Sequence, residues 1–95
     1  MLNIEEYIEI LIKEIKDLRK VEGLVPWIIY QGMELQLCAI SHKKDVIIFE
    51  GYTREQDWTK ILASYSSGMA LAIQRKAPAV DKELDLQDNL KKYLL

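Results

Sequence analysis

The sequence predicts an α+β fold in the order α-β-β-β-α-α: an N-terminal helix, a three-stranded antiparallel meander, a long helix and a short C-terminal helix. Residues 3–22 and 53–77 repeat apolar side chains at steps of three and four, which is the period of a helix with one buried side. Three short apolar runs with tight turns lie between these stretches, as in a meander. A chain of 95 residues fits one domain, 1–95.

The first helix is expected over Asn3–Glu22. The Asn3 side chain can accept a hydrogen bond from the first-turn amides, and Glu6 three residues later completes a capping box. Gly23 is the expected stop, because glycine adopts the left-handed conformation at low cost. The apolar side of this helix consists of Ile4, Tyr7, Ile8, Leu11, Ile15 and Leu18.

Three strands are expected over 24–30, 33–40 and 46–49. Pro26 indicates the start of a strand or a sheet edge, because proline cannot donate a hydrogen bond to a central ladder. The second strand alternates apolar and polar side chains, which predicts one dry and one wetter face. Between the second and third strands, Ser41–Asp45 is predicted to be a polar turn.

The long helix is expected over Thr53–Ala77, with Thr53 as its cap and Gln56 at the capping-box position. Pro78 then breaks the chain, and a last helix is expected from Asp81 to about Tyr93. The apolar side of the long helix would consist of Trp58, Ile61, Leu62, Tyr65, Met69, Ala72 and Ile73.

Small side chains fill the opposite side of this predicted long helix. They either let the first helix cross closely or form the contact of a homodimer. Aromatic and charged residues at the strand edge and at the helix start are further candidates for a partner contact, because such residues build interaction hot spots. The interface candidates are Ala63, Ser67, Gly68, Ala70, Trp27, Tyr30, Arg54 and Glu55.

Composition argues against several classes of function. The formal net charge is −2, whereas nucleic-acid-binding proteins usually carry a basic excess. Cys38 and His42 are the single cysteine and the single histidine, too few for a structural zinc site. Asp45 could orient the histidine of a catalytic pair, but Cys38 is expected inside a strand and His42 in an exposed turn, with no oxyanion site nearby. We therefore predict no catalytic, metal-binding or cofactor-binding residues, and no enzyme. The most apolar window, Ile61–Ile73, is too short to span a membrane, so a cytoplasmic protein is expected.

The predicted function is a non-catalytic protein–protein interaction, as a small regulator, adaptor or inhibitor that acts as a homodimer and is of the size common in phages and prokaryotic mobile elements. One alternative is a nucleic-acid-binding regulator that uses Lys43-Lys44 and Arg75-Lys76. The other is a small-molecule sensor with a pocket between sheet and long helix, lined by Trp27, Trp58 and Tyr65.

The predicted order of elements resembles that of the double-stranded-RNA-binding domain. That family carries a lysine-rich motif at the start of the helix after the sheet. The matching stretch here, Thr53–Asp57, contains two acidic residues, Glu55 and Asp57. These carboxylates would repel phosphate, which disfavours RNA binding at this position.

Overall fold

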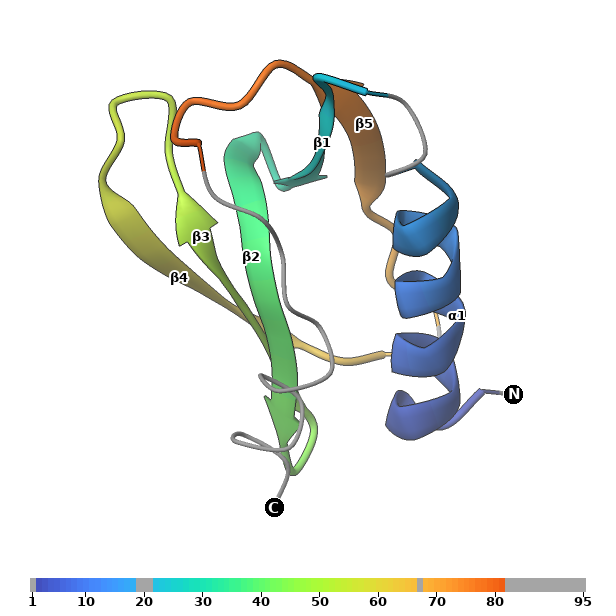
Figure 1. Ribbon diagram of the computed structural model, residues 1–95. Coiled ribbons are helices and arrows are strands. Elements are labelled where there is room, and N and C mark those ends of the chain that lie inside the picture. The colour runs from blue at the N-terminus through green and yellow to red at the C-terminus, as the bar shows by residue number, and fades with distance from the viewer. Residues whose placement is uncertain (1, 19–21, 67, 82–95) are drawn as a thin grey trace.

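The computed structural model describes residues 2–18, 22–66 and 68–81 (Figure 1). These residues form one helix and a five-stranded antiparallel sheet of order β4-β3-β2-β1-β5. In Figure 1 the helix lies beside β5 and β1 and covers one face of the sheet, which we call the helix face. We call the opposite side the open face. The elements are α1 (Ile4–Leu18), β1 (Val25–Tyr30), β2 (Met33–Lys43), β3 (Val46–Tyr52), β4 (Trp58–Ser64) and β5 (Ala72–Lys76).

The N-terminal helix α1 begins with the capping box that the sequence predicts. The Glu6 amide donates to Asn3 Oδ1 at 2.8 Å, and the Asn3 amide donates to Glu6 Oε1 at 3.2 Å. The helix faces the sheet with Ile8, Leu11 and Ile15, which are buried. The same period that predicts the helix therefore also identifies its buried side.

The core lies between α1 and the helix face of the sheet. Removing these apolar side chains from water is the main favourable contribution to folding, and truncating one such Leu or Ile to Ala typically costs about 2–5 kcal/mol. The buried cluster consists of Ile8, Leu11, Ile15, Ile28, Leu35, Leu37, Ile40, Ile47, Phe49, Ile61 and Ala63.

The predicted order α-β-β-β-α-α is wrong after the third strand. Residues 53–77 form a turn, strand β4, a connection and strand β5, with no long helix. The buried side chains of β4 alternate: Ile61 and Ala63 point into the core, whereas Trp58 and Leu62 are exposed. Apolar residues at 58, 61, 62 and 65 have helical spacing, whereas the strand signal is the alternation of Thr59, Ile61 and Ala63 with exposed residues. The β-branched and aromatic residues of this segment also favour the strand.

The capping signature at Thr53 belongs to a hairpin turn. The Thr53 amide donates to Asp57 O at 3.0 Å, and the Gln56 amide donates to Thr53 O at 2.9 Å. The Asp57 amide also donates to Thr53 Oγ1 at 3.3 Å, and Gln56 has a positive φ of 68°. A threonine side chain that satisfies a nearby amide occurs in turns as well as at helix starts, so this local signal fits both.

The described residues between β4 and β5, 65–66 and 68–71, lie on the helix side of the sheet (Figure 1). Tyr65, Met69 and Leu71 are partly buried against the core. The Tyr65 hydroxyl donates to the Leu2 carbonyl, and its ring lies 5.4 Å from the Tyr7 ring. Burial, followed by the proximity of Tyr65, raises the pKa of the Tyr7 phenol above its ordinary value.

Strand β5 pairs with β1, so β1 is an internal strand that contains Pro26. The two-residue turn Gln31-Gly32 has φ values of 50° and 79°, so the hairpin closes on the hydrogen-bonded pair Tyr30 and Met33. Even-numbered residues of β1 therefore direct their backbone toward β2. The β1–β2 ladder starts only at Trp27, so the missing N–H of Pro26 removes no ladder bond.

The contact between β2 and β3 requires glycine at position 51. The pairing register shifts between Leu37 and Ala39, which marks a β-bulge opposite Gly51. A Cβ atom at Gly51 would lie 1.8 Å from the backbone oxygen of Gln36. The bulge and the glycine are therefore one feature, which brings the two backbones unusually close.

The chain after β5 crosses the end of the open face. We call residues 77–81 the strap. The predicted last helix, from Asp81 to about Tyr93, lies outside the described residues except for Asp81 itself, which is in no helix.

Candidate functional site

Strand β4 forms one edge of the sheet, at the far left in Figure 1. Its pairing with β3 continues at both ends into hydrogen bonds from the Tyr65 amide to Asp45 O at 2.7 Å and from the Thr53 amide to Asp57 O at 3.0 Å. In an antiparallel ladder, hydrogen-bonded pairs recur at every second residue. Odd-numbered residues of β4 therefore bond to β3, and even-numbered residues direct their N–H and C=O groups away from the sheet.

The side chains of the same even-numbered residues lie on the open face. Leu62 is 65% exposed and Trp58 is 48% exposed. Lys60 lies between them and forms an ion pair at 3.3 Å with Glu50 of β3, whose side chain is buried. The Trp58 ring packs edge-on against Tyr52 at 5.1 Å. Strand β4 thus combines open backbone groups with exposed apolar side chains.

The opposite edge strand, β5, has fewer backbone N–H and C=O groups that point away from the sheet. The odd-numbered residues of β1 face β5, and they pair with Ala72, Gln74 and Lys76. Only Ile73 and Arg75 within this five-residue strand therefore direct their backbone groups outward. Charge on the strand and the short length both protect such an edge against pairing with another chain.

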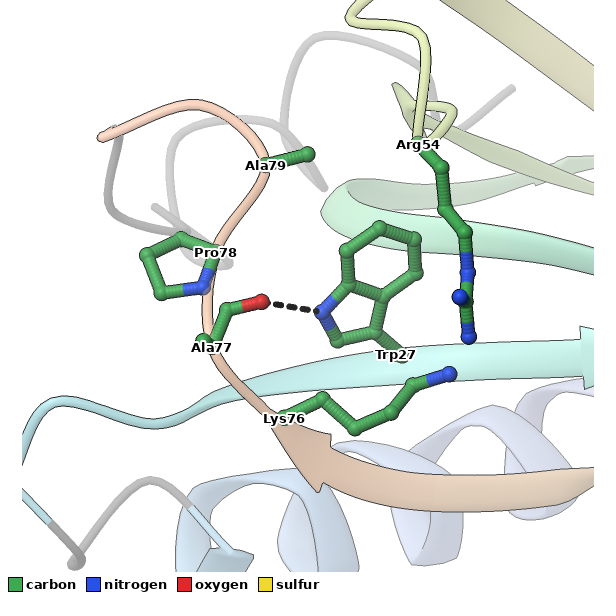
Figure 2. A pocket seen from close by; sticks show the side chains of 6 residues that line it. All are labelled: Trp27, Arg54, Lys76, Ala77, Pro78 and Ala79. Atoms are coloured by element: carbon green, nitrogen blue, oxygen red, sulfur yellow. Dashed lines mark hydrogen bonds between the residues drawn. The ribbon is translucent and has the colours of Figure 1, made fainter.

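A hollow of about 270 Å³ lies on the open face near β5 (Figure 2). Figure 2 shows the Trp27 indole between the strap and the side chains of Arg54 and Lys76. The indole Nε1 donates to Ala77 O at 3.3 Å, and Lys76 Nζ lies 5.1 Å from the ring centroid. Cation–π attraction and the hydrogen bond together hold the indole in place.

Glu34 joins the two cations of this hollow. Its carboxylate accepts hydrogen bonds from Lys76 Nζ at 3.1 Å and from Arg54 Nε at 2.5 Å. The hydrogen bond from Lys76 and then that from Arg54 lower the pKa of the Glu34 carboxyl below its ordinary value. The carboxylate thus offsets one of the two positive charges, and the cluster braces β2, β5 and the turn after β3.

Gln36 fixes the strap to the sheet. Its Oε1 accepts hydrogen bonds from the amides of Ala79 at 2.8 Å and Val80 at 3.0 Å, and its Nε2 donates to Val80 O at 2.7 Å. The Gln56 side chain adds a hydrogen bond to Ala79 O at 2.9 Å. Gln36 itself is buried, so these bonds satisfy an amide that would otherwise cost free energy in the interior.

The sequence-predicted interface residues do not gather on one surface. Trp27 and Arg54 meet at the hollow, and Glu55 lies beside Arg54 in an exposed turn. The others are separate: Ala63 is buried in β4, Tyr30 is half-buried, Gly68 and Ala70 are exposed in the connection, and Ser67 lies outside the described residues. The helix that would align the small residues is absent, so they share no stripe.

The predicted pocket of the small-molecule alternative is also absent. It required the long helix, which residues 53–77 do not form. Tyr65 packs with the core on the helix side, whereas Trp27 and Trp58 belong to the open face. The three aromatic residues therefore do not line a common cavity.

His42 lies within β2 and is buried, contrary to the predicted exposed turn, because β2 extends to Lys43. Its Nδ1 has no hydrogen-bond partner among the described residues. The buried Cys38 donates a weak hydrogen bond from Sγ to Gln36 O at 3.8 Å. The described residues contain no group of three or more His, Cys, Asp or Glu side chains that could hold a metal ion. The predicted absence of catalytic, metal and cofactor residues stays a prediction.

Strand β4 is the surface that sequence reasoning missed. The helical period of residues 53–77 places the exposed Lys60 and Leu62 in a helix, although their alternation with Thr59, Ile61 and Ala63 is a strand signal.

Among the described parts of the chain, α1 is the one helix, and it is too short and too polar to cross a membrane. Comparison of the chain with protein-family models, with curated proteins and with solved structures found no match.

Proposed function

We infer that this chain is a non-catalytic protein that acts by binding other protein surfaces, as a small regulator, adaptor or inhibitor, and that it works as a homodimer. One observation carries this proposal: in the part of the chain that the structure describes, β4 is an edge strand without the usual protection. Its only charged residue is Lys60, it contains no proline, and it exposes Trp58 and Leu62. Natural proteins usually block such an edge, because an open edge pairs readily with another chain.

The nucleic-acid alternative has less support. Lys76 is paired with Glu34, and the carboxylate lowers the positive potential at that end of β5. Lys43 and Lys44 are exposed at the β2–β3 hairpin, but Asp45 lies in the same turn. These charges give no continuous basic surface on the described residues.

Sedimentation velocity tests the homodimer directly. The purified full chain is measured from the micromolar to the millimolar range at two salt concentrations. A concentration-dependent rise to the mass of two chains, with weak salt dependence, supports a dimer held by backbone and apolar contacts. A protein that sediments as a monomer throughout that range would contradict the homodimer, and binding to DNA or RNA that weakens steeply with salt would favour the alternative.

A further inference from the structure

We propose that the dimer forms by antiparallel pairing of β4 with β4 of a second copy, about a two-fold axis at Ile61. The proposal rests on the homodimer inferred above and specifies its surface, register and contacts. The two sheets then continue into each other across the axis. The helix faces of both copies come to the same side of the joined sheet, because a two-fold axis perpendicular to the sheet keeps its faces.

The backbone of β4 fits this register. The outward N–H and C=O groups belong to Trp58, Lys60, Leu62 and Ser64. With the axis at Ile61, Lys60 stands opposite Leu62 of the second copy, and Trp58 stands opposite Ser64. Both pairs join two outward-facing residues, so each is a hydrogen-bonded pair. All outward groups of the strand are then satisfied.

The neighbouring registers are less favourable. An axis at Lys60 places two lysines directly opposite each other, and like charges in a cross-strand pair are destabilising. An axis at Leu62 leaves Trp58 without a partner inside β4. The register centred on Ile61 instead places the Lys60 stem along Leu62 of the second copy, while the ammonium stays with Glu50 at 3.3 Å.

The charge pattern and the length of β4 fit a second copy of this chain better than another protein. The strand is complementary to itself over Trp58–Ser64, its full extent. The apolar Leu62, which is 65% exposed, is covered by a lysine stem whose charge is already paired within its own chain. A strand of another protein would need the same spacing of an apolar residue and a paired cation.

Disulfide trapping tests the axis. In a Cys38→Ala background, Ile61→Cys places two thiols at the central non-hydrogen-bonded pair, where Cα atoms lie about 4.5 Å apart. Thr59→Cys is the matched control on the same strand and face, since its symmetry mate is displaced by four residues, or about 14 Å along the strand. Oxidation at dilute concentration is expected to cross-link Ile61→Cys at least tenfold faster than Thr59→Cys.

A second set of variants avoids the buried position. Lys60→Cys and Leu62→Cys, each in the Cys38→Ala background, are oxidised separately and as a mixture. The proposal predicts the 60–62 cross-link as the main product of the mixture, with slower products from either variant alone. Equal cross-linking of all variants, or none in a sample that sediments as a dimer, would overturn the β4 register and leave the homodimer standing. A wild-type chain that is monomeric throughout would overturn both.

Discussion

The two edges of the sheet differ in what they offer a second chain. Strand β4 has seven residues. Four of them direct their backbone N–H and C=O groups away from the sheet edge and their side chains onto the open face: Trp58, Lys60, Leu62 and Ser64. Strand β5 has five residues, with basic side chains at its end and outward backbone only at Ile73 and Arg75. Within the described residues, one sheet thus has a protected edge at β5 and an unprotected edge at β4.

The difference follows from what supports each edge. Near β5, Lys76 is held by Glu34 and Trp27, and the strap crosses the adjoining strands through Gln36. Among the described residues, no strand covers the outer side of β4. An open edge offers unpaired backbone groups to another strand, and the proposed dimer uses this contact.

The largest effect is expected from Gly51→Ala. It disrupts β3, the strand that supports β4, and would therefore remove the difference between the β4 and β5 edges. The new Cβ would lie 1.8 Å from Gln36 O, so β2 and β3 must separate. We expect a loss of about 3–5 kcal/mol in the free energy of unfolding, measured by urea denaturation. Gly68→Ala is the control, because no described atom beyond its chain neighbours lies within 4 Å of the added Cβ, and it should change stability by less than about 0.5 kcal/mol.

Proline on each edge gives the next largest effect. Leu62→Pro and Arg75→Pro each remove an outward N–H and spare the ladder inside the sheet. Leu62→Pro should weaken the dimer at least about tenfold, because the symmetric interface loses a hydrogen bond on each side at roughly 1 kcal/mol each. Arg75→Pro should leave the sedimentation profile unchanged. Equal behaviour of the two variants would remove the distinction between the edges.

Gln36→Leu sharpens the comparison by loosening the strap alone. The change removes the three hydrogen bonds to Ala79 and Val80. We expect a loss of about 1–3 kcal/mol in the free energy of unfolding, measured by thermal denaturation, because partly buried backbone groups of Ala79 and Val80 lose their partner. The exposed Gln74→Leu, on the same row of the sheet, is the control. A dimer that dissociates on Gln36→Leu would show that the strap, and not only β4, holds the second copy.

The smallest effect concerns pH. Hydrogen bonds from Lys76 and Arg54 lower the pKa of Glu34 in the folded state below 4.5, its ordinary value. The folded state therefore gains stability from the ionised carboxylate above the unfolded-state pKa, and loses it as pH falls through the lowered pKa. Glu34→Gln should flatten the acid side of the stability–pH curve, with dimerisation by β4 unaffected. An unchanged slope in denaturation from pH 6 to pH 2 would contradict this role.

The N-terminal helix could be predicted because local and tertiary signals agree. The capping pair Asn3 and Glu6 and the buried side chains Ile8, Leu11 and Ile15 all follow one period. The turn Gln31-Gly32 and the strands around it were also predicted, since glycine and β-branched residues act locally.

Residues 53–77 could not be assigned correctly because their signals conflict. Thr53 accepts amide hydrogen bonds in this turn, as it would at a helix start. Trp58, Ile61 and Leu62 have helical spacing, although the strand places Ile61 on one face of the sheet and Trp58 and Leu62 on the other. The pairing of β5 with β1 favours the strand over the helix in this segment. It joins residues about fifty positions apart, which no local sequence pattern connects. The candidate site was missed with the strand, because an edge exists only once the sheet order is known.

Residue-resolved amide hydrogen exchange, measured at a low and at a high protein concentration, tests the pairing of β4 with a second copy most directly. The amides of Lys60 and Leu62 should exchange fast in the dilute sample and become protected in the concentrated one, because they bond to the second copy. The amides of Ile73 and Arg75, which also face outward, should exchange equally fast in both. Exchange at Lys60 and Leu62 that does not change with concentration in a sample that sediments as a dimer would contradict pairing through β4.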